Sequence, residues 1–409
     1  MGKKVKAESN VPSLQEGEIV LSGRGNEYKV LKKLGEGGFG AVYKVQLNEN
    51  LFAMKIESVQ ERFQVLKMEV SVLKSLEKHG GRHFCRISDR GRNDRFNFII
   101  MTLVGKNLGD LRRECQGMKF SVGTAVRLGI QCLEAVEDLH EIDYLHRDLK
   151  PGNYAIGTEQ SGEQRKVYIL DFGMCRKYRN EKGELRTPRS AANFRGTVRY
   201  APLSCHRNRE MCRKDDLETW FYMQVELTKG FLPWKNCGDK HEVGRMKEHA
   251  RTDEGKLEML KSCPRSYTRI MDYIDSLKYW DKPDYEFIYH LLQRILRHRS
   301  VKLEDPYDHE VTVYTVHGSQ RSDAALLLVL SCLLWKKKKK MKGAAKKQLL
   351  SCKEDGRTLR TSNACFCAPP CGYGYGQDYG PRWHEASQTT PQLQIQQELQ
   401  LVSESLSTD

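Results

Sequence analysis

Apolar and polar residues alternate over short stretches near the N-terminus, which is the pattern of half-buried β-strands. These stretches cover residues 28–34, 41–47 and 51–56, and a polar turn separates the last two. Residues 61–77 instead place apolar side chains at helical spacing, and 96–104 indicates one more strand. The pattern predicts a small, mostly β lobe built on an antiparallel meander with one helix.

A helical period dominates after residue 105. Ser121 is the predicted N-cap of a long helix ending near Glu141, because its hydroxyl can accept a hydrogen bond from a free backbone N–H of the first turn. Residues 166–170 predict a short strand, whereas the basic stretch 174–214 lacks a period and predicts a long surface loop. Further helices are predicted over 217–227, 240–251, 267–277 and 284–297. A larger, mainly helical lobe should therefore follow the β lobe.

Both ends of the chain lack this periodicity. Residues 1–27 predict a flexible arm, and residues 309–409 a low-complexity, disordered basic tail. Within the tail, the apolar run 324–335 is shorter than the roughly 20 residues that a membrane span requires, and lysines follow it. Weak contact of 324–347 with a membrane surface stays open, as does a role for the tail as a tether to membrane or nucleic acid.

Composition narrows the class of protein without identifying it. The chain has 409 residues, 39 % hydrophobic and 30 % charged, which is typical of a globular protein with polar extensions. Its net charge of +15 favours acidic partners but indicates no specific nucleic acid. The 13 cysteines are odd in number and scattered, and Met1 leads into no apolar run. We therefore expect a monomer with reduced thiols in a cytoplasmic or nuclear setting.

A glycine-rich stretch lies between the first two predicted strands. Gly35, Gly37 and Gly40 are spaced so that backbone N–H groups can approach phosphate oxygens with no side chain between them. A helix would follow a dinucleotide-binding loop, and Gly-Lys-Ser/Thr would end a Walker loop; neither occurs here. A phosphate-covering hairpin and a plain glycine-rich hairpin both fit. Lys55, in the third strand, would suit the α- and β-phosphates if Glu69 on the next helix paired with it.

Four further polar residues have spacings that suit phosphoryl transfer. Asp148, Lys150 and Asn153 share a short loop, and Asp171 follows the predicted strand at 166–170. Transfer from ATP requires positioning, charge neutralisation and a group that receives the hydroxyl proton. Asp148 is the candidate for that group, Lys150 can contact the phosphoryl group, and Asn153 and Asp171 offer the oxygen ligands that Mg²⁺ prefers. Their order and spacing together indicate a phosphotransferase.

These motifs resemble those of eukaryotic protein kinases. The resemblance rests on the glycine loop, the strand lysine Lys55, the sequence His146-Arg-Asp148 and the sequence Asp171-Phe-Gly. More narrowly, the chain is similar to the casein kinase I superfamily and its tau-tubulin kinase branch. The narrower likeness lies at residues 65–70, 146–155, 194–201, 208–211, 215–217, 232–234 and 282–285.

The resemblance implies a fold, cofactors and a reaction. The fold would be the α+β, two-lobed protein kinase fold, with an N-lobe over 28–104 and a C-lobe over 105–308. The cofactors would be ATP and Mg²⁺, and the γ-phosphate would pass to Ser or Thr hydroxyls of protein substrates. A catalytically weak pseudokinase scaffold is the alternative.

The resemblance also implies roles for single residues. Asp148 and Lys150 would be catalytic, and Asn153 and Asp171 would bind the metal. Met101 would be the gatekeeper at the start of the hinge. The residues expected around ATP come from the glycine loop, the strands beside it, the first helix and the hinge: Leu34, Gly35, Glu36, Gly37, Gly38, Phe39, Gly40, Ala41, Val42, Ala53, Lys55, Glu69, Met101 and Leu103.

The resemblance also covers two residues that support the catalytic loop, and it fails at one position after Pro202. Thr197 matches a threonine that bonds Asp148, and Asp216 matches a buried acid that anchors the catalytic loop. Leu203 follows Ala201-Pro202, where most kinases have a glutamate, so the usual glutamate–arginine ion pair is missing there.

The basic loop at 174–214 predicts the kind of substrate. Clustered arginines beside the catalytic loop should favour acidic or already phosphorylated protein segments. We expect Arg199, with Arg245 or Lys247, to bind such a group.

Overall fold

The computed structural model of the protein describes residues 12–37, 40–61 and 64–311. Gly38 and Phe39, in the predicted glycine loop, lie outside the described residues, as do residues 312–409 of the predicted tail.

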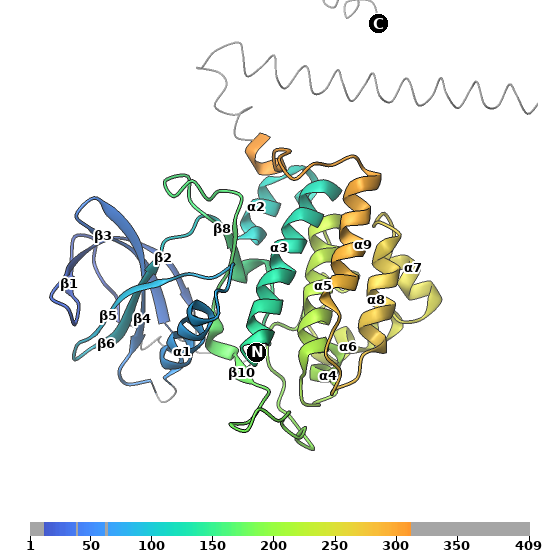
Figure 1. The fold of residues 1–409 in the computed structure, drawn as a ribbon, viewed down its shortest axis with the longest axis horizontal. Coiled ribbons are helices and arrows are strands. Elements are labelled where there is room, and N and C mark those ends of the chain that lie inside the picture. The colour runs from blue at the N-terminus through green and yellow to red at the C-terminus, as the bar shows by residue number, and fades with distance from the viewer. Residues whose placement is uncertain (1–11, 38–39, 62–63, 312–409) are drawn as a thin grey trace, which may run out of the picture. The chain divides into compact units, whose positions relative to one another are not determined.

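The N-terminal lobe contains one antiparallel sheet of six strands in the order β1-β2-β3-β4-β6-β5 (Figure 1). Alternating side chains give the sheet an apolar face, where Tyr28, Tyr43 and Phe98 are buried. The strands are β1 Ile19–Leu21, β2 Glu27–Gly37, β3 Gly40–Leu47, β4 Asn50–Ser58, β5 Ile87–Arg92 and β6 Phe96–Thr102. The predicted meander and the strand near 96–104 are confirmed, and β5 is an addition.

The prediction of a flexible arm over residues 1–27 is wrong for the described part of that range. β1 pairs with β2, and Leu14 and Val20 are buried in the core of the sheet. β1 has only three residues, which is too short for alternation to distinguish a strand from a polar arm.

Helix α1 (Val65–Lys78) packs against this sheet (Figure 1). The helix begins at Val65, later than the predicted residue 61. At this start the Glu57 carboxylate accepts hydrogen bonds from the backbone N–H groups of Val65 (2.5 Å) and Leu66 (2.9 Å). Glu57 thus caps the helix from a neighbouring strand, because the side chain of Gln64 at the N-cap position makes no capping hydrogen bond to the first turn. The period correctly predicted the buried face of this helix.

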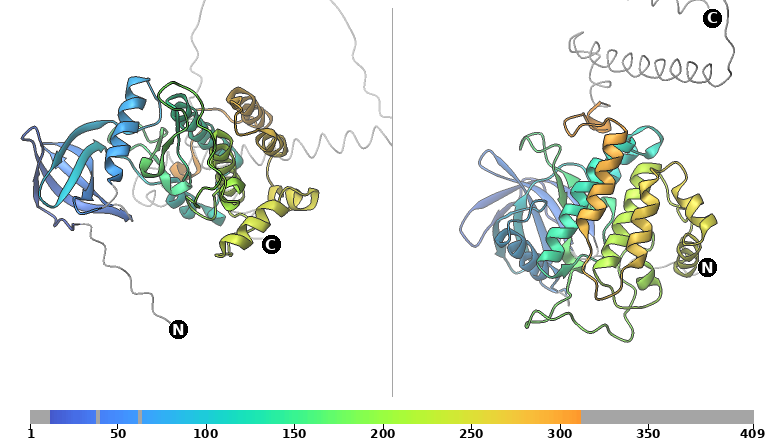
Figure 2. Two further views of the ribbon diagram at one scale, coloured as in Figure 1. Left: turned by 90° about the horizontal axis from the view of Figure 1, so that it is seen from below. Right: turned by 45° about the vertical axis from the view of Figure 1, so that its right-hand side comes forward.

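The C-terminal lobe is helical, and α5 lies at its centre. This helix contacts α3 and α8, while α9 lies along α3 (Figures 1 and 2). Ser121 caps α3 as predicted, accepting a 3.2 Å hydrogen bond from the Thr124 N–H. The helices are α2 Leu108–Glu114, α3 Val122–Glu141, α4 Leu203–His206, α5 Arg213–Lys229, α6 Lys240–His249, α7 Asp253–Leu260, α8 Ser266–Ser276 and α9 Tyr285–His298. The predicted helices are confirmed, whereas α2, α4 and α7 were not foreseen.

Two short pairs of strands position the polar loops. The strands are β7 Tyr144–Leu145, β8 Tyr154–Ile156, β9 Val167–Ile169 and β10 Arg176–Lys177. The loop with Asp148 connects β7 to β8, and the segment with Asp171 connects β9 to β10. Because β7 pairs with β10 and β8 with β9, the two loops are held side by side.

The folded body continues past the predicted boundary at residue 308. His309 is buried, and its ring contacts the ring of Phe120 with centroids 6.4 Å apart. Residues 309–311, which were predicted to begin the disordered tail, therefore belong to the folded domain. None of the helices in the described ranges combines the length and apolarity that crossing a membrane requires.

Candidate active site

A cavity of about 640 Å³ is lined by residues of both lobes. Its apolar wall includes Val42, Ala53 and Met101 from the sheet, with Ala155 and Leu170 from the C-lobe. At its polar end lie the side chains that the sequence singled out. Among the described residues predicted to contact ATP, all line this cavity except Ala41, whose side chain is buried in the sheet core: Leu34, Gly35, Glu36, Gly37, Gly40, Val42, Ala53, Lys55, Glu69, Met101 and Leu103.

The glycine loop connects two paired strands, which confirms the hairpin prediction. Gly35 pairs with Val42, and Gly37 with Gly40, across β2 and β3. A Cβ atom on Gly40 would lie 2.1 Å from the carbonyl oxygen of Ile56, so only glycine fits there. A strand follows the loop, and this excludes the dinucleotide-binding arrangement, which requires a helix.

Lys55 on β4 forms ion pairs with Glu69 of the N-lobe and with Asp171. Its Nζ lies 2.5 Å from Glu69 Oε2 on α1 and 3.5 Å from Asp171 Oδ1. Burial alone would lower the pKa of Lys55, but the carboxylates of Glu69 and Asp171 raise it above its ordinary value. The ammonium group therefore stays charged and faces the cavity where phosphates would lie.

Asp148 is held by three donors at the floor of the cavity. Its Oδ1 accepts hydrogen bonds from the backbone N–H (2.8 Å) and the hydroxyl (2.7 Å) of Thr197, and its Oδ2 lies 2.6 Å from Lys150 Nζ. Gly196 has a φ of +92°, and a Cβ there would lie 2.6 Å from the carbonyl oxygen of Arg147. Glycine at this position thus lets the downstream segment reach Asp148.

Asp216, at the start of α5, fixes the backbone before Asp148. Its buried carboxylate accepts hydrogen bonds from the N–H groups of His146 (2.7 Å) and Arg147 (2.9 Å), and it lies 2.9 Å from His140 Nε2. Burial would raise the pKa of Asp216, yet the hydrogen bond and charge of His140 hold it below the ordinary value. Arg147 adopts a φ of +69°, a conformation that non-glycine residues rarely adopt and that these bonds maintain.

Asn153 and Asp171 offer oxygen atoms to a metal ion. The Asn153 amide nitrogen donates to the Asp148 carbonyl oxygen (2.9 Å), which leaves the amide oxygen of Asn153 as a ligand. Asp171 has a φ of +63°. Burial would raise the pKa of Asp171, but Lys55 and His146 lower it below its ordinary value, so it is a carboxylate.

This donor set fits a magnesium nucleotide. One carboxylate and one amide oxygen leave the remaining positions of a hexacoordinate ion to phosphate oxygens and water, as Mg²⁺ prefers. Lys55 supplies a fixed positive charge, and the apolar wall suits a purine. Cys85, Ala155, Leu170 and Met174 also line the cavity and were not predicted. Leu170, directly before Asp171, is the one that its position could have revealed.

A glutamate on helix α5 takes the place of the glutamate that is missing after Pro202. Glu218 on α5 accepts hydrogen bonds from the Leu203 N–H (3.0 Å), the Tyr222 hydroxyl (2.6 Å) and Arg251 of the α6–α7 connection (2.9 Å). The ion pair is buried on the glutamate side. Glu218 therefore links the segment after Pro202 to the helical core.

Lys247 cannot contact a substrate, so that part of the prediction is wrong. The side chain is fully buried, and its Nζ donates to the carbonyl oxygens of Val198 (2.8 Å) and Ala201 (2.6 Å) and to His206 Nε2 (3.1 Å). Helix periodicity placed Lys247 on α6 without showing that this face packs under the loop. Lys247 instead holds the loop at 198–201 in place through its backbone carbonyl groups.

The other two predicted anion ligands remain partly exposed. Arg199 lies 3.1 Å from the buried carboxylate of Glu226, and Arg245 pairs with Glu242 on its own helix. Each keeps part of its guanidinium at the surface.

Taken together, a six-stranded lobe, a helical lobe and a polar cavity between them define a two-lobed kinase. The protein kinase domain family matches residues 28–344. The chain therefore belongs to the protein kinase family.

Three similar proteins are serine/threonine kinases by name or casein kinase homologues. A probable serine/threonine-protein kinase of Dictyostelium discoideum is 37 % identical over 286 residues, which are 69 % of this chain and 56 % of that protein. The serine/threonine-protein kinase spe-6 of Caenorhabditis elegans is 37 % identical over 289 residues (69 % and 75 %). Casein kinase I homolog 2 of Schizosaccharomyces pombe is 32 % identical over 290 residues (69 % and 66 %). The match thus spans little more than half of the Dictyostelium protein.

Proposed function

We propose that this protein is an ATP-dependent serine/threonine kinase that phosphorylates hydroxyl groups of other proteins. The observation that carries the proposal is the convergence of Lys55, Asp148, Lys150, Asn153 and Asp171 on one cavity. Bound ATP and Mg²⁺ would supply the phosphoryl group and the metal charge that neutralises it. No catalytic side chain of the described part is replaced by an inert one, which favours an enzyme over a pseudokinase scaffold.

The chain's own residues divide the work. Lys55 would hold the phosphates, and Asn153 and Asp171 would hold the metal ion. Asp148, oriented by Thr197, aligns the substrate hydroxyl and receives its proton. Lys150 is close enough to Asp148 to stabilise negative charge that develops on the transferred group.

The test uses the purified full chain with Mg²⁺, radiolabelled ATP and protein substrates, followed by analysis of the labelled amino acids. Label on Ser and Thr, absent with Lys55→Met, supports the proposal. Nucleotide binding without transfer would support the scaffold instead.

We further propose a tau-tubulin kinase-like member of the casein kinase I superfamily that prefers acidic or phosphorylated segments. The motifs at 146–155 and 194–201 support the branch. Arg195 and Arg209 are exposed, and neither has an acidic partner among the described residues. Arg195 directly precedes Gly196, which lies beside Asp148. A substrate anion would therefore meet Arg195 close to the reacting hydroxyl.

Matched peptides with and without a phosphoserine near the acceptor test this preference. We expect a higher kcat/KM for the phosphorylated peptide, and Arg195→Gln should reduce that ratio more than Arg294→Gln on the distant α9. Equal kcat/KM values for the two peptides would refute the preference but leave the kinase activity intact.

A further inference from the structure

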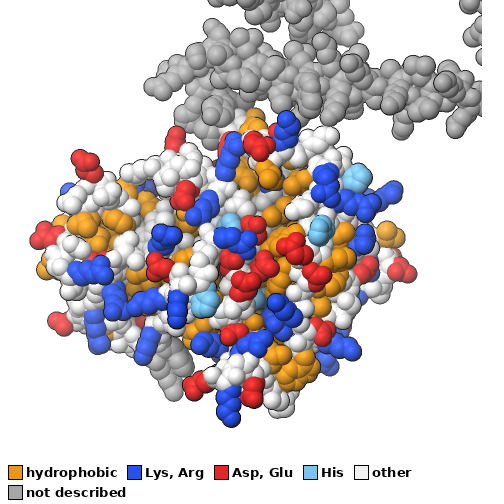
Figure 3. Space-filling model, in the orientation of Figure 1, with side chains coloured by type: hydrophobic (Ala, Val, Ile, Leu, Met, Phe, Trp, Pro, Cys, Tyr) orange, Lys and Arg blue, Asp and Glu red, His pale blue; other side chains and the backbone are white. Residues whose placement is uncertain are grey.

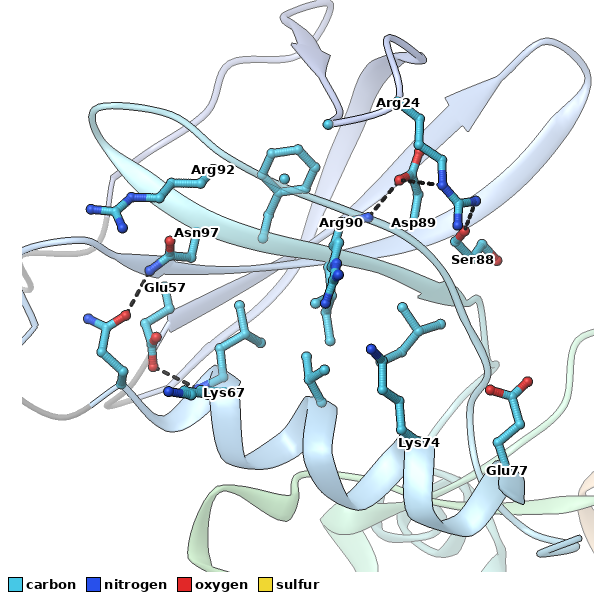
Figure 4. Close-up of a pocket in the computed structure, with 18 residues that line it drawn as sticks. Arg24, Glu57, Lys67, Lys74, Glu77, Ser88, Asp89, Arg90, Arg92 and Asn97 are labelled. Atoms are coloured by element: carbon cyan, nitrogen blue, oxygen red, sulfur yellow. Dashed lines mark hydrogen bonds and ion pairs between the residues drawn. The ribbon is translucent and has the colours of Figure 1, made fainter. Parts of the chain in front are cut away.

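A second cavity, of about 820 Å³, lies between α1 and strands β5 and β6 (Figure 4). Among the residues that the structure describes, it shares no lining residue with the candidate active site. We call it the N-lobe groove, and its apolar floor consists of Leu66, Val70, Ile87, Phe98 and Ile99. Val70 and Ile87 are only half-buried, so apolar surface is left for another molecule to cover.

Cations surround this floor. Lys67 and Lys74 rise from α1, and Arg90 and Arg92 project from β5 on the opposite side (Figure 4). All four are exposed, and none makes an ion pair with another described residue. Figure 3 shows Lys and Arg side chains gathered over this part of the N-lobe.

The acids of the groove do not neutralise these cations. Glu57 is buried and caps α1 through the N–H groups described above. Asp89 is buried, and its carboxylate accepts hydrogen bonds from the side chains of Asn26 and Tyr28. Glu77 is the exposed acid of the lining, at the end of α1. The accessible edge of the groove is therefore positive.

We propose that the N-lobe groove docks an acidic peptide segment of a partner protein. Asp and Glu side chains of the segment would pair with Lys67, Lys74, Arg90 and Arg92, and interspersed apolar side chains would cover Val70 and Ile87. A nucleic acid would match the charges but offers no aliphatic side chains to the floor, so the combination favours a peptide. The docking is independent of phosphoryl transfer.

Binding of a defined probe tests the proposal without ATP. The probe is a fluorescein-labelled peptide in which Asp and Glu alternate with Leu and Phe, with no Ser, Thr or Tyr to occupy the active site. Fluorescence anisotropy measures its affinity for the full chain at moderate salt. We expect Lys74→Glu/Arg90→Glu to weaken binding at least about tenfold, because two surface charge pairs are reversed.

Two controls make the result specific. Lys278→Glu/Lys282→Glu changes the net charge equally on a distant surface and should leave the affinity unchanged. A peptide with Gly in place of Leu and Phe should bind the wild type more weakly, which tests the apolar floor even if a charge variant misfolds. Equal affinity of the two double variants, or of the two peptides, would overturn the proposal. So would an oligonucleotide that binds the groove as tightly as the probe.

Discussion

A double-mutant cycle on Glu218 and Arg251 should reveal a strong, buried interaction that replaces the missing glutamate after Pro202. The variants are Glu218→Gln, Arg251→Met and the double substitution. Glutamine keeps an acceptor for the Leu203 N–H and the Tyr222 hydroxyl, so the first change removes mainly the charge. The coupling energy then reports the ion pair itself.

The structure sets the expected size of this coupling. The two side chains approach to 2.9 Å, and they are 4 % (Glu218) and 20 % (Arg251) exposed. At an effective dielectric constant of about 20, such a pair attracts by roughly 6 kcal/mol before desolvation is subtracted. Asp275 also lies 3.1 Å from Arg251, so that arginine keeps one partner in the Gln variant. We expect a net coupling of about 2–3 kcal/mol.

Urea denaturation monitored by the buried Trp220 and Trp234 gives the four unfolding free energies. The matched control is the Arg207–Glu248 pair, which has the same 2.9 Å separation but side chains 47 % and 48 % exposed. Its coupling should be below about 1 kcal/mol. If the two cycles gave equal couplings, the claim that Glu218 replaces the missing residue would be refuted.

Three further changes probe the catalytic loop and its support. Asp216→Asn should lower the unfolding free energy by about 2–4 kcal/mol and reduce kcat, because a buried charge that accepts two backbone N–H bonds is lost. Urea denaturation measures the unfolding free energy and steady-state kinetics measure kcat. Unchanged values of both would contradict the anchoring role of Asp216. Thr197→Val should reduce kcat about tenfold or more with little effect on the KM for ATP, and Thr197→Ser should restore it, since the hydroxyl orients Asp148. Burial lowers the pKa of Lys247 to about 7 from 10.5. Between pH 7 and 10.5 the unfolded chain therefore binds more protons at this site than the folded chain, so the contribution of Lys247 to the unfolding free energy rises with pH. In Lys247→Met this rise should be smaller by up to about 1.4 kcal/mol per pH unit. Parallel pH profiles of the unfolding free energy for the two proteins would contradict this.

Local pattern was sufficient for much of the fold. Ser121 and the period after it predicted α3 because capping and amphipathicity act within one element. Asp148 and Asp171 were predicted from the spacing of the motifs, and Asp171 also from the short strand predicted directly before it at 166–170. The correct inference that a strand follows the glycine loop also excluded a dinucleotide site.

Features that depend on packing between distant elements could not be predicted. Lys247 was assigned to a substrate anion because nothing in its own helix reveals that the loop at 198–201 covers it. Glu218 replaces a residue that is missing fifteen positions earlier in the usual motif, and only the packing of α5 against the α6–α7 connection shows this. The N-lobe groove likewise requires α1 and β5 to lie side by side, and β5 itself lacked a clear alternation.

Phosphate transfer by Asp148→Asn tests the central claim most directly. The wild-type chain and the variant are given Mg²⁺, radiolabelled ATP and the same protein substrate, and initial rates are compared. Asparagine keeps the size of the side chain and an acceptor for Thr197 but cannot receive the hydroxyl proton. We predict a loss of about 10²–10⁴-fold in rate with nucleotide binding retained. Equal rates in the two proteins, or no transfer by the wild type, would contradict the assignment of this cavity as a kinase active site.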